Sequence, residues 1–174
     1  AGKAAGKSRI EYCSGGDDVR SVRRLAMEKE LRAAVENDCA DFEVMLAPIV
    51  EKNGDALSCA GAEATLQWES QSLGTVSSNE FLPLAEYLGL IVPLGRHILH
   101  VACERCRYWN DFGHPDFRVI VNLSMVQLLR SDVVELISRA LEESGVEPSH
   151  VIIRFREWGA SEYKVRVERA LSRI

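Results

Sequence analysis

The side chains best suited to chemistry lie in three segments with the pattern of β-strands. Glu63 and Gln67 alternate with apolar residues in "AGAEATLQWES", Asn122 lies in "FRVIVNLS", and Arg154 lies in "HVIIRFREW". Because successive side chains of a strand point to opposite faces, each segment has one apolar face and one face that becomes polar toward its carboxyl end. The polar face either meets water or lines a site.

Strands and helices alternate along the chain in the manner of an α/β protein. We expect strands at residues 42–52, 56–70, 117–124 and 150–158, with a tight turn at "NGD" between the first two. The spacing of apolar residues predicts a helical region over 81–109, divided near Gly89, Pro93 and Gly95 into two helices, and further helices over 131–144 and 161–174. This alternation is typical of a parallel or mostly parallel sheet.

The polar strand face has two interpretations. One is a sheet with helices on one side and water on the other, although parallel sheets are normally covered on both faces. The other is a closed barrel, with helices outside and polar groups gathered inside at the carboxyl ends of the strands, and we favour it. A carboxylate (Glu63) and an amide oxygen (Asn122) on neighbouring strands are suitable ligands for a hard cation, but two such groups fall short of a full magnesium site.

Composition excludes several classes of protein. The 174 residues are 47% apolar and 27% charged, which is sufficient for a packed core. The net charge of −5 and the isoelectric point near 5.5 argue against binding to nucleic acid polymers. No apolar run has the length of a membrane segment, and "AGKAAGKSR" lacks the hydrophobic region of a signal peptide. We therefore expect a cytoplasmic location, with any membrane anchor of the parent protein outside this segment.

The five cysteines do not have the spacing of a disulfide framework. Cys103 and Cys106, in "CERC", have the spacing of half a zinc site or of a redox motif, but no second pair of ligands follows at a suitable distance. The same spacing places both thiols on one side of a helix. We favour a buried helix face, since free cysteine is among the most buried residue types.

Five motifs in order resemble those of the EAL domain, the cyclic di-GMP phosphodiesterase module of bacterial second-messenger signalling. They run from about Glu30 to Glu157 and read "MLAPIV", "GAEATLQW", "FLPLAEYLGLIVPLGRHIL", "VIVNLS" and "VEPSHVIIRFRE". The resemblance implies a TIM-like β/α barrel, of which this chain would hold about half. It also implies Mg²⁺ or Mn²⁺ as cofactor, with Glu63 and Asn122 as metal ligands, and hydrolysis of cyclic di-GMP to linear pGpG.

The beginning of the chain, "AGKAAGKSRIEYC", is similar to the end of a GGDEF (diguanylate cyclase) domain. We therefore expect three parts: residues 1–16 as the remnant of a GGDEF-like domain, 17–37 as a linker helix, and 38–174 as the N-terminal part of an EAL domain. An upstream GGDEF-type domain is then the expected partner in the parent protein.

Several positions depart from the family pattern. Ala47 replaces a base-contacting glutamine, and Gln67 replaces a phosphate-contacting arginine, keeping a donor but losing the charge. Arg154 stands where a metal-binding glutamate is expected, and a guanidinium repels a cation. The family's D-D-F-G-T-G motif, catalytic lysine and late glutamate would all come after Ile174. The resemblance therefore predicts a catalytically inactive domain with no catalytic residue in this chain.

Gln67 and Arg154 are the candidate ligand-binding residues. Arg154, with Arg156 on the same strand face, would occupy the space of the metal and attract a phosphate directly. The alternative is that both arginines form salt bridges with carboxylates such as Glu63.

Three functions remain open from the sequence. The favoured one is a degenerate EAL module that acts as a cyclic di-GMP receptor or regulates a neighbouring domain. The second is a fragment of an active, metal-dependent phosphodiesterase, and the third is a protein-interaction module without nucleotide binding. Half a barrel would leave open sheet edges, so a homodimer that closes the sheet by strand exchange is a further expectation.

Overall fold

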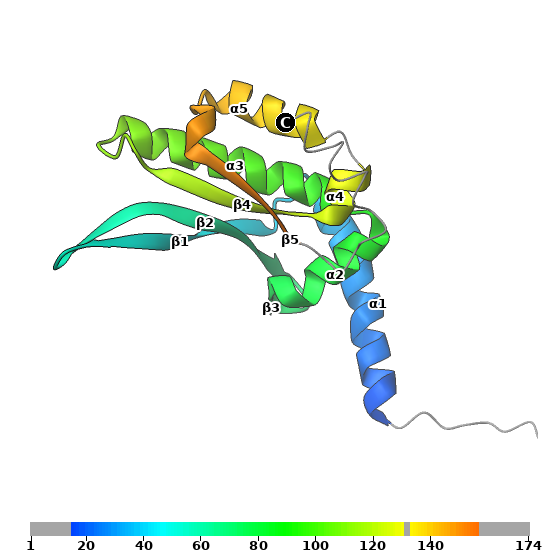
Figure 1. The fold of residues 1–174 in the computed structure, drawn as a ribbon. Coiled ribbons are helices and arrows are strands. Elements are labelled where there is room, and N and C mark those ends of the chain that lie inside the picture. Colours follow the sequence, from blue (N-terminus) through cyan, green and yellow to red (C-terminus); the bar gives the residue numbers. More distant parts are fainter. Residues whose placement is uncertain (1–14, 131–132, 157–174) are drawn as a thin grey trace, which may run out of the picture.

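The computed structural model describes residues 15–130 and 133–156 of the chain (Figure 1). The elements follow in the order α1 (Gly15–Glu36), β1 (Phe42–Asn53), β2 (Ala56–Ser70), β3 (Gly74–Val76), α2 (Ser78–Leu88), α3 (Ile91–Asp111), β4 (Arg118–Ser124), α4 (Met125–Arg130), α5 (Val133–Ser144), the 3-10 turn η1 (Pro148–His150) and β5 (Val151–Arg156). The predicted helix at 161–174 and most of the predicted GGDEF remnant lie outside the described residues.

The sheet is mixed, with the strand order β1-β2-β4-β5 and the short β3 paired to the end of β2. β1 and β2 are antiparallel, whereas β4 is parallel to both β2 and β5. The sequence pattern predicted a parallel or mostly parallel sheet. The first pair differs because the turn at Gly54 is too short for a parallel crossover, and its positive φ of 64° suits glycine.

Helices cover one face of this sheet. Figure 1 shows α3 lying along β4, with α5 on the outer side of α3. The strand side chains beneath them are buried, as the alternation predicted: Ala62, Ala64, Leu66 and Trp68 of β2, and Val119, Val121 and Leu123 of β4. The opposite face, which carries the polar side chains, has no helix over it within the described part of the chain.

An aromatic cluster packs the end of β2 against β1 and α2. The rings of Phe42 and Trp68 stack with centroids 5.7 Å apart, and Phe81 meets both rings edge-on at 5.4 and 5.9 Å. Leu31 of α1 is also fully buried in this core. The cluster joins the first hairpin to the helices and thereby holds β2 in place.

Helix α1 is tied to the domain by two sets of polar contacts. Arg23 Nε lies 2.7 Å from Glu80 Oε1 of α2, and the Glu30 carboxylate accepts hydrogen bonds from the hydroxyls of Ser70 and Ser72. The serine hydroxyls lower the pKa of Glu30 from its ordinary value, and the Arg23 hydrogen bond does the same for the pKa of Glu80. The helix predicted over 17–37 is therefore present and docked. Its role as a linker stays a prediction.

The helical region between β3 and β4 divides at one of the three expected positions. Gly89 ends α2 with a left-handed φ of 75°, whereas Pro93 and Gly95 both lie inside α3. Proline is tolerated there because its position in the first turn has no intrahelical partner for the missing N–H. The sequence reasoning missed the short elements β3 and α4.

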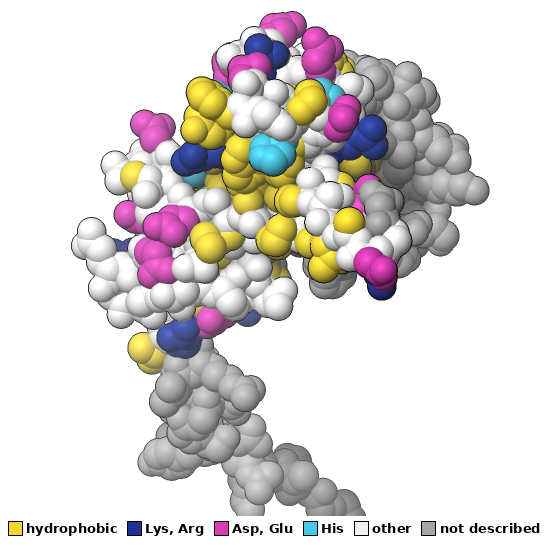
Figure 2. Space-filling model, turned by 90° about the vertical axis from the view of Figure 1, so that its left-hand side faces the viewer, with side chains coloured by type: hydrophobic (Ala, Val, Ile, Leu, Met, Phe, Trp, Pro, Cys, Tyr) yellow, Lys and Arg dark blue, Asp and Glu magenta, His cyan; other side chains and the backbone are white. Residues whose placement is uncertain are grey.

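The side of the molecule at the tip of the β1–β2 hairpin is shown in Figure 2. Hydrophobic side chains fill the middle of this view, and acidic side chains gather at the left and along the top. Exposed Tyr108 and Phe112 stack on one another with centroids 4.5 Å apart. Among the described helices, none combines the length and the apolar character that crossing a bilayer requires.

Candidate functional site

Three of the four predicted site residues lie side by side on the open face of the sheet. Glu63 is on β2, Asn122 on β4 and Arg154 on β5, and the register of β4 and β5 places Asn122 directly beside Arg154. On the other side of Glu63, β1 places Ala47 directly opposite. The side chains form a row across four strands because each has the parity that points away from the helices.

Glu63 is the centre of this row. Asn122 Nδ2 donates a hydrogen bond to Glu63 Oε1 at 2.6 Å, and Arg154 Nη1 donates to Glu63 Oε2 at 3.3 Å. The Arg154 side chain is 50% exposed and that of Glu63 is 31% exposed. The salt bridge that the sequence analysis weighed for Arg154 is therefore formed. Such a solvated ion pair contributes only about 0–1 kcal/mol, so it does not lock the arginine in place.

Gln67, the fourth predicted residue, lies apart from this row. It is on the same face of β2 as Glu63, but four residues further along the strand, or about 13 Å away. Its Nε2 donates to Glu69 Oε1 at 2.8 Å, and Thr75 of β3 donates to the other oxygen of Glu69 at 2.9 Å. The structure thus separates Gln67 from the residues with which it was grouped.

The end of β4 beyond Asn122 is held by a capping box that the sequence analysis missed. The Ser124 hydroxyl accepts a hydrogen bond from the backbone N–H of Gln127 at 3.2 Å. In return, the side-chain oxygen Oε1 of Gln127 accepts one from the backbone N–H of Ser124 at 2.7 Å. Gln127 packs so closely against α3 that a Cβ on Gly95 would lie 1.6 Å from its Nε2. The S-x-x-Q spacing was the signal that could have revealed both α4 and this support for Asn122.

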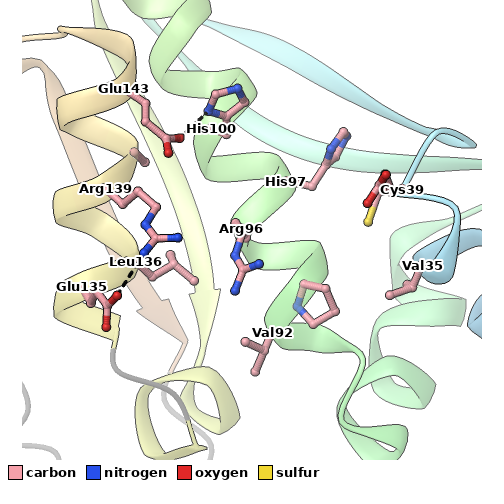
Figure 3. Close-up of a pocket in the computed structure, with 13 residues that line it drawn as sticks. Val35, Cys39, Val92, Arg96, His97, His100, Glu135, Leu136, Arg139 and Glu143 are labelled. Atoms are coloured by element: carbon pink, nitrogen blue, oxygen red, sulfur yellow. Dashed lines mark hydrogen bonds and ion pairs between the residues drawn. The ribbon is translucent and has the colours of Figure 1, made fainter.

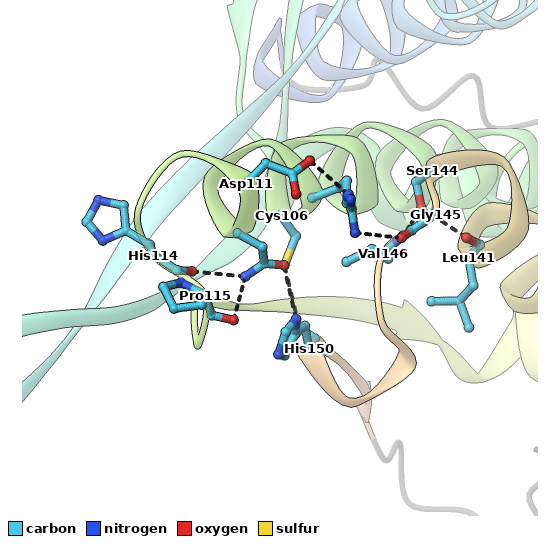
Figure 4. Close-up of polar contacts among 11 residues, drawn as sticks. Cys106, Asp111, His114, Pro115, Leu141, Ser144, Gly145, Val146 and His150 are labelled. Atoms are coloured by element: carbon cyan, nitrogen blue, oxygen red, sulfur yellow. Dashed lines mark hydrogen bonds and ion pairs between the residues drawn. The ribbon is translucent and has the colours of Figure 1, made fainter.

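The start of β5, which positions Arg154, is anchored to the end of α3 (Figure 4). Asn110 Nδ2 donates to the carbonyl oxygens of His114, Pro115 and Phe117 at 3.0 to 3.2 Å, and Asn110 Oδ1 lies 3.0 Å from His150 Nδ1. A single amide thus joins the loop before β4 to the turn before β5. This contact favours the register that brings Arg154 beside Asn122.

Cys103 and Cys106 are both buried on α3, as their spacing indicated. Burial raises the pKa of the Cys103 thiol to about 12 and that of Cys106 to about 11. Cys106 Sγ donates to the Phe117 carbonyl oxygen at 3.4 Å. Both thiols therefore stay protonated near neutral pH, which does not suit a metal ligand or a nucleophile.

The row on the open face does not fit a divalent cation. Both oxygens of Glu63 already accept hydrogen bonds, one of them from a guanidinium. Asn122 Oδ1 is buried without a hydrogen-bond partner in the described part of the chain, so it supplies one further oxygen at most. Over residues 15–130 and 133–156, no group of three or more His, Cys, Asp or Glu side chains is placed to hold a metal ion. The positive charge of Arg154 disfavours a cation beside Glu63.

Comparison with known proteins agrees with the motifs and the fold. A family model described as the EAL domain matches residues 28–173. The chain is 34% identical over 157 residues to the bifunctional diguanylate cyclase/cyclic di-GMP phosphodiesterase MucR of Pseudomonas aeruginosa, covering 88% of this chain and 22% of MucR. It is 32% identical over 145 residues to the cyclic di-GMP phosphodiesterase NbdA of the same organism, covering 83% of this chain and 18% of NbdA. The chain thus spans about a fifth of these curated relatives.

Solved structures show the same likeness. The PaMucR phosphodiesterase in complex with c-di-GMP superposes with a TM-score of 0.72 at 33% identity, covering 85% of this chain and 60% of that one. The FimX EAL domain of Xanthomonas citri, also in complex with c-diGMP, has a TM-score of 0.68 at 17% identity, covering 90% and 59%, which shows the fold alone. The described half-barrel arrangement and the matched family together lead to one conclusion: the chain belongs to the EAL domain family.

Proposed function

We propose that this EAL domain binds cyclic di-GMP on the open face of its sheet without hydrolysing it, and acts as a receptor or as a regulator of a neighbouring domain. The observation that carries the proposal is the ion pair between Arg154 and Glu63. By family resemblance Glu63 is a metal ligand and position 154 is another. A guanidinium at position 154 removes one metal ligand, and its ion pair with Glu63 neutralises the charge of another.

Arg154 also provides what a phosphodiester needs from a receptor. Its guanidinium is half exposed and is held by a weak, solvated pair, so a phosphate oxygen can replace the Glu63 oxygen as acceptor at little cost. Asn122 can stay bonded to Glu63 while the Arg154 guanidinium turns to the phosphate. Gln67 would contact a more distant part of the dinucleotide, since it lies farther along β2.

The relatives support cyclic di-GMP as the ligand. MucR and NbdA are named as cyclic di-GMP phosphodiesterases, and the MucR domain was solved in complex with that dinucleotide. These names also support the alternative, in which the parent protein of this chain is an active, metal-dependent phosphodiesterase. The contact between Glu63 and Asn122 favours this alternative, because it places the two metal ligands expected from the family side by side.

Isothermal titration of the full chain with cyclic di-GMP in the presence of a chelator tests the proposal. We expect saturable binding without metal, weakened about tenfold or more in R154A, because a charge-assisted hydrogen bond to phosphate is lost. R105A is the matched control, since Arg105 is an exposed arginine on α3. Binding that is unchanged in R154A would contradict the assignment of the ligand to this face.

A hydrolysis assay with Mn²⁺ separates the two functions. We expect no linear pGpG from the wild-type chain. Formation of pGpG by the wild type would establish the phosphodiesterase instead. R154E restores a carboxylate beside Glu63, and we expect it to gain affinity for Mn²⁺ and lose metal-free binding of the nucleotide.

The wider setting is also a proposal. We infer that the parent protein carries a GGDEF-type domain before α1 and works in the cytoplasm. The docked α1 would then transmit changes from that domain through Glu30 to the end of β2, where Ser70 lies. A second copy of the chain that completes the sheet is part of the same proposal, and its test is the mass of the particle in solution.

A further inference from the structure

A groove on the helix side of the molecule lies far from the open strand face. It has a volume of about 470 Å³ and is bounded by α3, α5 and the turn that follows α1. This volume is within the range of small-molecule sites. Because α3 and α5 cover the sheet, the groove and the row at Glu63 lie on opposite sides of the β-layer.

Two arginines from different helices converge on this groove. Figure 3 shows Arg96 on α3 and Arg139 on α5, both lining the groove, with the Arg139 guanidinium beside Glu135 of its own helix. Arg139 pairs with Glu135 at 3.1 Å, whereas Arg96 forms no ion pair with any residue that the structure describes. Both side chains are exposed to solvent, so an anion in the groove can reach both guanidinium groups.

Two of the three carboxylates that line the groove have a basic side chain as partner. Glu135 is held by Arg139, and Glu143 lies 3.4 Å from His100 Nδ1, whose Nε2 lies 3.5 Å from Glu104. Asp38 is on the far side, at the turn after α1. The positive charge of Arg96 is therefore the one that no neighbouring carboxylate offsets among the described residues.

Much of the remaining lining is apolar. Val92 of α3, Leu136 and Ala140 of α5, and Val35 of α1 line the groove beside the arginines. A pocket with an apolar lining and a few convergent charged groups suits a small organic anion better than a bare ion. The apolar lining would take the body of the ligand, and the two guanidinium groups would take its oxygens.

We propose that the groove between α3 and α5 is a second ligand site, which binds a small organic molecule bearing an oxyanion through Arg96 and Arg139. The oxyanion is a phosphomonoester or a carboxylate, both of which match the planar fork of a guanidinium. The site is independent of the proposed cyclic di-GMP site, because it shares no residue with that site. A ligand that bridges the two arginines would tie α5 to α3.

The test is isothermal titration of the full chain, at constant ionic strength, with three probes: inorganic phosphate, guanosine 5′-monophosphate and succinate. We expect saturable binding of at least one probe, and the comparison of phosphate-bearing probes with succinate identifies the source of the oxyanion. R96A and R139A should each weaken binding about tenfold or more, and R96K should weaken it less, since the charge is kept and the fork is lost.

Two further variants separate this site from a general charge effect. R105A, which removes an exposed arginine from the same helix, should leave binding within about twofold of wild type. E143Q should tighten binding, because it removes a negative charge from the groove. No saturable binding of any probe would overturn the proposal, as would an equal loss in R96A and R105A.

Discussion

The two faces of the sheet come from the same strands but are held by different forces. On the helix-covered face, Trp68 and Val121 are almost completely buried. On the open face, Glu63 and Arg154 are partly exposed and contact mainly each other and Asn122. The first face is therefore stabilised by burial of apolar area, and the second by a few solvated hydrogen bonds.

This difference explains how a site can change while the fold persists. A charge reversal at position 154, where the side chain is half exposed, would take place in solvent and require no repacking. The same change on the covered face would bury an unpaired charge and unfold the domain. Substitutions on the open face are therefore compatible with a retained EAL fold.

The largest effect is expected from Trp68, at the centre of the aromatic cluster. Trp68→Ala removes a side chain that is 1% exposed and contacts Phe42 and Phe81, at an expected cost of about 3–5 kcal/mol in the free energy of unfolding. Chemical denaturation followed by circular dichroism measures it. Thr65→Ala, on the exposed face of the same strand, is the control and should change stability by less than about 0.5 kcal/mol. Similar costs for both variants would abolish the contrast between the faces.

A smaller effect is expected where β2 meets β4 at Gly61. A Cβ at this position would lie 2.2 Å from the carbonyl oxygen of Arg118, which is backbone of the paired strand and has little freedom to move. Gly61→Ala should cost about 1–3 kcal/mol and loosen the β2–β4 pair. Hydrogen exchange at residues 118–121 measures the loosening, and protection equal to that of the wild type would contradict this account of the glycine.

Glu30 makes the docking of α1 sensitive to acid. Its pKa is lowered in the folded state by the hydroxyls of Ser70 and Ser72, so its contribution is present above the ordinary carboxyl pKa of 4.5 and is lost as the pH falls through the lowered pKa. Glu30→Gln should therefore lower the thermal unfolding midpoint at pH 7 and have a smaller effect at pH 3. An equal shift at both pH values would show that the carboxylate charge is not responsible.

The smallest effect on stability is expected on the open face. Arg154→Ala removes an ion pair whose arginine is half exposed, so the free energy of unfolding should change by no more than about 1 kcal/mol. The same variant is expected to lose affinity for cyclic di-GMP. A large loss of stability in R154A would mean that the row at Glu63 supports the fold, and the contrast between the two faces would fail.

Much of the fold was predictable because periodicity reports local burial. The alternation in β2 and β4 identified which side chains face the helices, and the turn at Gly54 and the helix end at Gly89 were visible as glycines. The strand β3 was missed because three residues are too few for a pattern. α4 was missed because its capping box, Ser124 with Gln127, was not considered.

The sequence predicted which residues lie on the face of the candidate site, but not which of them contact one another. Parity placed Glu63, Asn122, Gln67 and Arg154 on one face, and the structure agrees. It did not predict that Gln67 would lie apart and bond to Glu69. Nor did it predict the groove at Arg96 and Arg139, since neither arginine belongs to a motif.

The sequence by itself determined the strand faces, the helix spacing and the membership of the EAL family, because each of these follows from residue types at short separation. The tertiary structure alone decided which polar groups meet. Glu63 reaches Asn122 across 59 residues of sequence and Arg154 across 91, and Arg96 faces Arg139 only because α5 packs on α3. Such long-range contacts depend on strand register and helix packing. Both are set by the burial of the whole core, so no single segment of the sequence predicts them.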